Sequence, residues 1–296
     1  MNRRPPRPKR GALPAALHPD RVSIRPAPEA VKESVMESLV DFMVDEGIGQ
    51  ITIQRPEARN ALTWQAMDEF RMAVEQAEAA ADLRALLVTG CGGAFCAGGD
   101  LFELDGYLSR LDGVRLSTIM ADALDRLEAI PVPTIAAIEG PALGGGAEIA
   151  VACDLRVMAD GAALGMMHVR LAISPAWGGG QRLLRLAGYA RTLEWLAAGR
   201  VFTASEALEA GLVNRITARG QALAEARGLA RLFAAHDPAA VRAAKQVARA
   251  GARLPPAEAF RLERELFPEL WAAAPHREAS SVFVARRNHR PHATQG

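Results

Sequence analysis

Apolar and polar residues alternate where the patterned part of the chain begins. Apolar side chains take every second position over residues 40–44 and again over 51–53, with Gly47 and Gly49 between the two runs. A period of two is typical of β-strands with one buried face, and glycines between two such runs are typical of a tight turn. The pattern therefore predicts a β-hairpin.

Helical and strand patterns alternate after this hairpin. Apolar residues at helical spacing predict a helix over 60–81, and a short apolar run predicts a buried strand over 85–89. The cycle continues with a helix over 119–129, a strand over 134–138, a helix over 147–152 and a strand over 154–158. Strands that alternate with helices indicate an α/β fold whose parallel sheet is covered on both faces.

The pattern beyond Gly178 is almost wholly helical. Ala- and Leu-rich segments predict helices over 181–198, 205–210, 221–235, 238–250 and 256–273. The apolar faces of these segments need a partner, which another subunit can supply. We therefore divide the patterned chain into an α/β core over 36–235 and a C-terminal helical region over 236–296.

Residues 1–35 differ from the rest in composition, because basic residues and prolines dominate them. Such a segment buries too little apolar surface to offset its ordering entropy, so we expect a disordered tail. A start of translation at Met36 would also explain it. The functional alternative is a basic arm for RNA, for a membrane surface or for import into an organelle.

Composition excludes several classes of protein. The 296 residues carry a formal net charge of +1, which gives no general field for nucleic acid or an acidic membrane. Three cysteines without paired spacing predict neither a disulfide framework nor a zinc site, as in a reducing cytoplasm. No apolar run reaches the length of a membrane span. We expect a cytoplasmic protein without a metal, and binding to nucleic acid is not favoured.

Two glycine-rich turns, over 94–100 and 140–148, carry the candidate chemistry, and each follows a predicted buried strand. The second turn leads directly into a helix, whose first backbone N–H groups lack partners and suit an anionic oxygen. Neither turn has the Lys-Ser/Thr of a P-loop or the spacing of a Rossmann turn. Glu148 follows on the first helical turn, so the pattern favours an oxyanion hole beside a carboxylate.

Residues 55–62, 95–101 and 144–148 together resemble motifs of the crotonase (enoyl-CoA hydratase/isomerase) superfamily, and the resemblance covers Met36 to Pro291. It implies a spiral of ββα units, a homotrimer or hexamer, and an acyl-CoA substrate whose CoA is the only cofactor-like group. By this resemblance, the N–H groups of Gly99 and Gly145 would bind the thioester oxygen, with Glu148 as a catalytic residue. CoA would contact Ala58, Ala61, Ala97, Asp100 and Leu101.

The chain departs from the common family pattern at one position. Hydratases of the family have a second glutamate seven residues before the proline of a Pro-x-x-Gly-Gly segment. Here the proline is Pro175, and the position seven before it is His168. His168 and the segment that contains Trp177 are similar to the ethylmalonyl-CoA and methylmalonyl-CoA decarboxylase branch. We therefore list His168 as catalytic, Trp177 as substrate-binding, and decarboxylation of a short malonyl-type thioester as the expected reaction.

Decarboxylation is consistent with the loss of the second carboxylate. It needs a stabilised thioester enolate and a proton for the α-carbon, but no activated water. A protonated His168 could attract the substrate carboxylate, and either His168 or Glu148 could deliver the proton.

Other interpretations stay open. His168 could be a satisfied, partly buried histidine and Trp177 a core residue. The reaction could be that of an enoyl-CoA hydratase or isomerase of fatty-acid or related metabolism. The chain could also be an RNA-binding homologue, since some relatives on this fold bind RNA.

We expect structural roles for several other polar residues. Asp100 could cap a helix, and Glu139 is expected on the surface or in a loop. The arginines of one helix are expected on its solvated face, and the last histidines show no metal-ligand spacing. The arginines are Arg182, Arg185 and Arg191, and the histidines are His276, His289 and His292.

Overall fold

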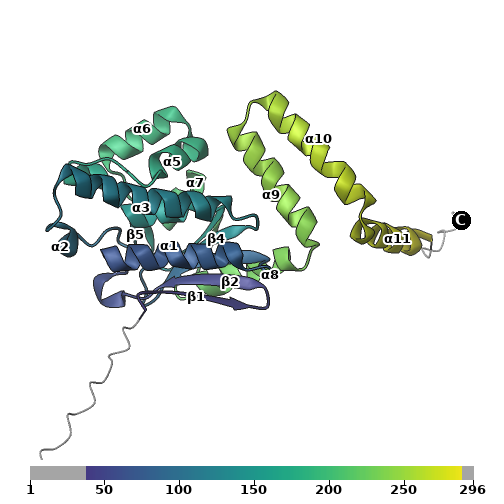
Figure 1. Ribbon diagram of the computed structural model, residues 1–296, viewed down its shortest axis with the longest axis horizontal. Coiled ribbons are helices and arrows are strands. Elements are labelled where there is room, and N and C mark those ends of the chain that lie inside the picture. Colours follow the sequence, from purple (N-terminus) through teal and green to yellow (C-terminus); the bar gives the residue numbers. More distant parts are fainter. Residues whose placement is uncertain (1–37, 289–296) are drawn as a thin grey trace, which may run out of the picture. The chain divides into compact units, whose positions relative to one another are not determined.

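The alternating segments form the strands of a six-stranded sheet (Figure 1). The computed structural model describes residues 38–288, with side chains as far as residue 285, so the predicted tail lies outside the described residues. The strands lie in the order β1 (Val40–Asp45), β2 (Ile48–Ile53), β3 (Ala85–Gly90), β4 (Thr134–Ile138), β6 (Leu155–Ala159) and β9 (Arg215–Thr217). Strands β1 and β2 are antiparallel, and the pairs that follow are parallel. The predicted hairpin and mainly parallel sheet are confirmed.

The hairpin turn between β1 and β2 needs residues that can adopt positive φ angles. Glu46 and Gly47 have φ angles of 50° and 76°, the left-handed conformation that two-residue hairpin loops favour. Val40 pairs with Ile53 and Asp45 with Ile48, so the alternating apolar positions of both strands face the same side.

Helices cover both faces of this sheet. Helix α1 (Trp64–Ala79) packs against β1 and β2 and against α3 (Arg110–Ala129), while α8 (Ala222–Ala234) packs against β3, β4 and β6. Alternate residues of one strand enter different cores: Leu86 and Val88 join the core under α1, and Ala85 and Leu87 join the core under α8. Burial on both faces explains why β3 is an uninterrupted apolar run.

Several short elements have no counterpart in the sequence prediction. Strands β5 (Ala142–Leu143), β7 (Ala163–Gly165) and β8 (Phe202–Thr203) form a second, three-stranded sheet. Two 3₁₀ helices, η1 (Pro56–Ala58) and η2 (His168–Leu171), and helix α2 (Leu101–Leu104) lie in connecting segments. Among the candidate site residues, these elements hold Ala58, His168 and Leu101.

The single helix predicted over 181–198 is wrong, because two helices occupy that segment. Helix α5 (Gly179–Ala187) ends at Gly188, whose φ of 79° cannot continue a right-handed helix, and α6 (Tyr189–Ala198) begins directly after it. The short helices α4 (Gly145–Ala152) and α7 (Ala204–Glu209) agree with the predicted segments to within two residues.

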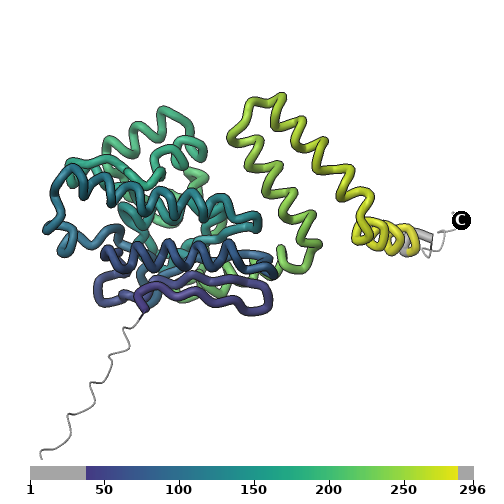
Figure 2. The backbone as a smooth tube through the Cα atoms, viewed as in Figure 1, coloured from purple at the N-terminus to yellow at the C-terminus, as the bar shows by residue number. Residues whose placement is uncertain are grey.

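Three helices form the C-terminal region, as Figure 2 shows by the change of colour toward yellow. They are α9 (Pro238–Arg253), α10 (Pro256–Ala272) and α11 (Ala274–Asn288), of which α11 was not predicted. The expected boundary at 235/236 falls between α8 and α9. Lys245 of α9 donates to the carbonyl of Val132 at 2.9 Å and pairs with Asp154 at 2.6 Å.

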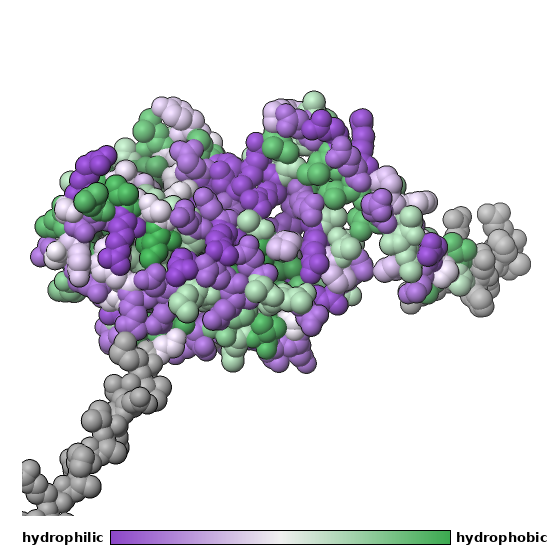
Figure 3. Space-filling model, in the orientation of Figure 1, coloured by the Kyte–Doolittle hydropathy of each residue, from purple (hydrophilic) through white to green (hydrophobic). Residues whose placement is uncertain are grey.

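Helix α10 buries none of its residues. Phe260, Phe267 and Trp271 of this helix are each 59% exposed, and Figure 3 shows hydrophobic side chains on the surface formed by α9 and α10. No helix within residues 38–288 has both the length and the apolar character that crossing a membrane would require.

Candidate active site

The two glycine-rich turns lie side by side. Cys96 and Ala142 form an isolated parallel bridge, in which the N–H of Cys96 donates to Pro141 at 3.1 Å and the N–H of Leu143 donates to Cys96 at 3.0 Å. Gly146 makes this approach possible, because a β-carbon built on it would lie 1.9 Å from the carbonyl oxygen of Cys96. Residues far apart in the sequence thus form one backbone surface.

Several backbone N–H groups of these turns have no acceptor within the described residues, and two of them are those that the family resemblance assigns to an oxyanion hole. Within residues 38–288, neither Gly99 N nor Gly145 N donates a hydrogen bond, although the neighbouring Gly144 N donates to Gly165 at 2.9 Å. Gly98 brings the turns together, since a β-carbon on it would lie 3.0 Å from Gly145 N. Gly145 is the first residue of α4, where the helix dipole favours an anion. The arrangement suits an oxyanion.

Gly144 produces the conformation that directs α4. Its φ of 54° and ψ of −123° are strained for any residue with a side chain. Helix α4 then carries Glu148 one turn beyond Gly145, and the helix is buried along its whole length.

The Glu148 carboxylate is almost completely buried, with 1% of the residue exposed. Its Oε2 accepts hydrogen bonds from Trp177 N at 2.9 Å and Gly179 N at 2.8 Å, and its Oε1 accepts from Ala176 N at 3.4 Å. These three donors come from the segment that leads into α5. A buried carboxylate is costly unless hydrogen bonds compensate it, and here the backbone provides them.

His168 lies against this carboxylate. Its Nε2 is 3.0 Å from Oε1 of Glu148, and only 9% of the residue is exposed. The other ring nitrogen, Nδ1, is buried and has no hydrogen-bond partner within the described residues. The structure therefore brings together the two residues that the sequence listed as catalytic, and it leaves His168 only partly satisfied.

Trp177 connects the carboxylate to the oxyanion turn. Its backbone N–H binds Glu148, and its ring lies where a β-carbon of Gly145 would be. The indole Nε1 donates to the carbonyl of Leu116 on α3 at 3.1 Å. Trp177 is 5% exposed, so it packs as a core residue while contacting both parts of the site. Its listing as a substrate-binding residue stays a prediction.

The expected CoA-binding residues surround the turn after β2. Ala58 ends η1, Ala61 is buried, Ala97 lies within the first glycine-rich turn, and Leu101 is 56% exposed at the start of α2. Asp100 accepts from the backbone N–H of Phe102 and caps α2, as the capping alternative supposed. These positions form one region beside Gly99, and their binding of CoA stays a prediction.

Arg55 and Asn60 hold this turn, and the sequence analysis assigned neither a role. Arg55 Nη1 pairs with Asp100 at 3.0 Å and also contacts the carbonyl of Ala61. Asn60, with a φ of 58°, donates to the carbonyls of Cys91 and Ala94 at 2.8 Å. An asparagine in this turn, between Arg59 and Ala61, is a usable signal, since asparagine tolerates the left-handed conformation.

The expectation that Arg182 lies on a solvated helix face is wrong. Arg182 is 3% exposed, donates to the carbonyl of Trp177 at 2.8 Å and pairs with Glu128 and Asp125 at 2.9 and 2.6 Å. Burial opposes ionisation of Glu128, but the hydrogen bond from Arg253 and the charge of Arg182 outweigh it and hold its pKa below the ordinary value. Arg185 and Arg191 are exposed.

Glu139 also has partners, because its carboxylate accepts from the backbone N–H groups of Gly220 and Ala222 before α8. Cys96 lies inside the first glycine-rich turn, where its Sγ accepts from Gly98 N at 3.4 Å. Burial raises the pKa of the Cys96 thiol to about 12, so this thiol is neutral and serves packing.

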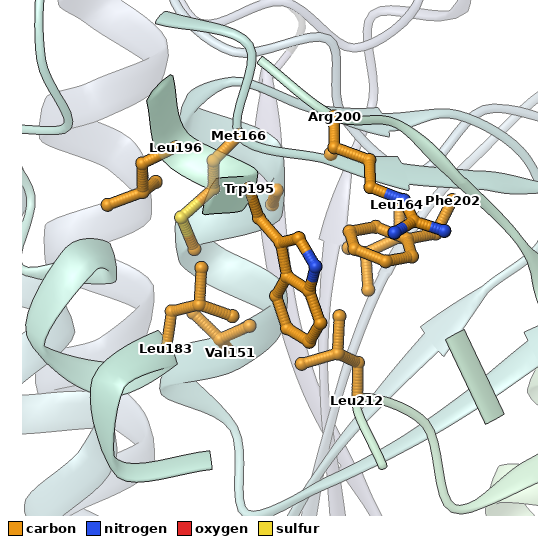
Figure 4. Close-up of a pocket in the computed structure, with 11 residues that line it drawn as sticks. Val151, Leu164, Met166, Leu183, Trp195, Leu196, Arg200, Phe202 and Leu212 are labelled. Carbon is orange, nitrogen blue, oxygen red and sulfur yellow. The ribbon is translucent and has the colours of Figure 1, made fainter. Parts of the chain in front are cut away.

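A cavity of about 20 Å³ lies behind α4 (Figure 4). Its labelled lining is mainly apolar and includes Val151 of α4, Leu183 of α5 and Trp195 of α6, with Arg200 at its edge. The cavity is far too small for an acyl-CoA molecule. It is a packing gap behind the helix that carries Glu148.

Comparison with known proteins gives one consistent family. The family model described as enoyl-CoA hydratase/isomerase matches residues 43–292. The protein YngF of Bacillus subtilis, which carries an enoyl-CoA hydratase/isomerase name, is 36% identical over 257 residues, covering 85% of this chain and 96% of that protein. Ethylmalonyl-CoA decarboxylase of Gallus gallus is 33% identical over 236 residues and covers 79% of each chain.

A solved structure agrees with these relatives. The enoyl-CoA hydratase from Bacillus anthracis superposes with a TM-score of 0.79 at 31% identity, covering 84% of this chain and 96% of that chain. The expected fold class, a spiral α/β core followed by helices, is thereby confirmed.

Proposed function

Because this chain belongs to the enoyl-CoA hydratase/isomerase family, we propose that it decarboxylates a short malonyl-type CoA thioester through a thioester enolate. Ethylmalonyl-CoA and methylmalonyl-CoA are the substrates to test first. The observation that carries the proposal is the 3.0 Å contact between His168 and Glu148, in a site where a hydratase would hold two carboxylates. The relative named ethylmalonyl-CoA decarboxylase supports it.

The reaction needs only what the site offers. The bond between the α-carbon and the carboxylate carbon breaks, CO₂ leaves, and the electron pair forms the enolate of the thioester. The N–H groups of Gly99 and Gly145 then hydrogen-bond the enolate oxygen, and one such donor is worth about 3 kcal/mol in the transition state. A proton delivered to the α-carbon completes the product. No cofactor is required beyond the CoA that belongs to the substrate.

Hydration or isomerisation of an enoyl-CoA is the second candidate. The hydratase names of YngF and of the Bacillus anthracis structure favour it. Its weakness is that a hydratase positions one water between two carboxylates, whereas here Glu148 faces a histidine and three backbone N–H groups. A histidine can donate to the substrate carboxylate but is a different base for water.

Parallel assays would separate the two reactions. The purified protein is incubated with ethylmalonyl-CoA, methylmalonyl-CoA and crotonyl-CoA, and release of CO₂ is compared with hydration. We expect CO₂ release to be the faster reaction by at least tenfold. Faster hydration of crotonyl-CoA would overturn the decarboxylase proposal and leave the hydratase in its place.

We also propose that CoA binds along the turn formed by Ala58, Ala61, Ala97, Asp100 and Leu101. The backbone there lies beside Gly99, so the thioester would reach the free N–H groups. A thermal-shift titration with CoA tests this, because a ligand of the folded state raises the melting temperature with its saturation. Leu101→Arg should reduce the shift, while the distant Gly251→Ala should leave it unchanged.

Finally, we propose that the chain assembles as a homotrimer or hexamer through α10 and α11. The exposed Phe260, Phe267 and Trp271 on a helix without buried residues support an apolar contact with a second copy. Light scattering after size exclusion tests this. Phe267→Glu should yield monomers, whereas Glu258→Gln, an exposed change on the opposite side of the same helix, should not change the mass. A monomeric wild-type protein would contradict the proposal.

A further inference from the structure

We propose that His168 is the residue that carries the proton to the substrate α-carbon, through Nδ1, and that Glu148 is a positioning residue that acts through His168. The inference deepens the proposed function and rests on it for the reaction. The sequence left both residues as proton donors, and the hydrogen bonds of the site distinguish them.

The oxygens of Glu148 are fully engaged. An ionised carboxylate offers about four acceptor positions, two on each oxygen. Oε2 accepts from Trp177 N and Gly179 N at 2.9 and 2.8 Å, and Oε1 accepts from Ala176 N at 3.4 Å and faces His168 Nε2 at 3.0 Å. Three of these donors are backbone groups that cannot turn away. A proton could bind Glu148 only by displacing one of them.

The same contacts decide which nitrogen of His168 is available. Nε2 faces a carboxylate oxygen that can only accept, so Nε2 carries a hydrogen and donates it. The remaining nitrogen, Nδ1, is buried and has no partner within the described residues. Buried polar atoms of folded proteins are almost always paired, so an unpaired one in a candidate site indicates a ligand contact. Nδ1 is therefore the atom that can exchange a proton.

The arrangement has the form of an oriented base. A carboxylate that holds one ring nitrogen fixes the ring's orientation and stabilises the charged ring, while the other nitrogen meets the substrate. With the ring protonated, both nitrogens carry hydrogens, and Glu148 supplies the negative charge that a buried imidazolium needs. The N–H at Nδ1 then attracts the substrate carboxylate.

The proton is accounted for through one turnover. After CO₂ leaves, the enolate electron pair forms a bond between the α-carbon and the hydrogen of Nδ1. The N–H bond at Nδ1 breaks, and its electrons stay on the nitrogen as a lone pair. The ring is then neutral, with its Nε2 hydrogen still donated to Glu148. A proton from water restores the charged ring, so each turnover consumes one proton.

Exchange of α-protons tests this assignment separately from decarboxylation. The full chain is incubated in D₂O with butyryl-CoA, which has no carboxylate to lose, and deuterium at the α-carbon is followed by mass spectrometry. The variants are His168→Ala, His168→Gln and Glu148→Gln, with the exposed His236→Ala as the matched control. Circular dichroism confirms that each variant is folded.

We expect both His168 variants to lose exchange by 10² to 10⁴-fold, the usual scale for a positioned acid or base. Added imidazole should restore part of the exchange in His168→Ala, because the free base can enter the space of the ring. Glu148→Gln should keep measurable exchange at a kcat reduced by about tenfold to a hundredfold, with KM unchanged. Recorded at a pH where the ring is neutral, its ¹⁵N-histidine spectrum should show a mixture of ring tautomers where the wild type has one.

Three results would overturn the assignment. They are wild-type exchange in His168→Ala, absence of exchange in the wild type, and loss of exchange in Glu148→Gln with the His168 signals unchanged. The last would make Glu148 the proton carrier. Failure of the proposed function is distinguishable: a wild type that exchanges α-protons but releases no CO₂ retains the assignment and loses the decarboxylase.

Discussion

The indole ring of Trp177 fills the space beside Gly145 so closely that a β-carbon built on Gly145 would lie 2.0 Å from Cζ3 of that ring. The backbone N–H of the same tryptophan binds Glu148. One residue therefore fixes both the turn that presents a free N–H and the carboxylate that contacts His168. The two halves of the site cannot shift independently.

Gly145→Ala is predicted to inactivate the protein. The added methyl group must displace the Trp177 ring or the turn, and misplacing one oxyanion donor costs about 10² to 10³ in kcat. Steady-state assays with the best substrate of the panel would measure this loss. The matched control is Gly113→Ala in α3, where nothing lies within 4 Å of the added carbon.

The control should keep full activity and gain up to about 1 kcal/mol of stability, because alanine favours a helix more than glycine does. Equal activity in Gly145→Ala and wild type would show that Gly145 N does not bind the substrate oxygen. Circular dichroism would show whether the Gly145→Ala protein is folded. Gly145→Ser should lose activity for the same steric reason.

Trp177→Phe is predicted to have a graded effect. Phenylalanine keeps an aromatic ring against Gly145 but removes the hydrogen bond from Nε1 to Leu116, which is 3.1 Å long. Leaving that carbonyl without its partner should cost about 1 to 2 kcal/mol of stability. We expect a lower melting temperature and a kcat within tenfold of wild type, measured together on each variant.

Trp177→Ala provides the contrast. It empties the space beside Gly145 as well, so its kcat should fall well below that of Trp177→Phe at similar KM. Identical kinetics in the two variants would show that the ring does not position the turn and only supports α3.

The sequence predicts the large elements because they have clear periodicity. Val40 to Ile53 alternates with period two, and the apolar run from Ala85 is long enough to indicate a strand buried on both faces. Strands of two or three residues, such as β5 and β8, contain too few positions to show any period. Gly188 ends α5, although the Ala and Leu residues on both sides of it favour a continuous helix. The high helix propensity of the flanking residues outweighs one glycine in a sequence-based prediction.

The candidate site, like the fold, could be predicted only in part from the sequence. The resemblance to the family's motifs predicted Gly99, Gly145, Glu148 and His168, because each stands at a fixed place in one of those motifs. Their hydrogen bonds could not be predicted, because the donors to Glu148 come from a segment about thirty residues away along the chain. Burial of Arg182 depends likewise on carboxylates of α3, which a helical pattern cannot reveal.

The buried thiols should be unreactive in the folded protein. Burial raises the pKa of Cys96 and of Cys153 to about 12, from a reference value of 9.0. A disulfide reagent attacks the thiolate, so at pH 8 only the partly exposed Cys91 should be labelled without denaturant. Labelling of all three thiols should require unfolding, which timed mass spectrometry would show.

The same shifts set a pH dependence. The unfolded chain ionises these thiols near pH 9, whereas the folded chain keeps them protonated, so folding stability is fully present below pH 9 and is lost as pH rises toward 12. Replacing both cysteines by alanine should flatten this part of the stability curve. Rapid labelling of Cys96 in the native protein would contradict the burial on which both expectations depend.

His168→Glu tests the choice between a histidine and a second carboxylate most directly. The new side chain would face Glu148 in a site where the two residues are 9% and 1% exposed, so two negative charges would lie in contact away from water. Such a pair repels a further anion. We expect the KM for methylmalonyl-CoA to rise more than tenfold and CO₂ release to fall, measured beside the neutral control His168→Gln.

Binding of butyryl-CoA, which carries no acyl carboxylate, should change much less in His168→Glu. The restored pair of carboxylates should also allow slow hydration of crotonyl-CoA, because a water could then be held between them. Wild-type decarboxylation in both variants would show that residue 168 does not meet the substrate. The site would then act through its oxyanion turn alone, since Glu148 would have no group left to orient.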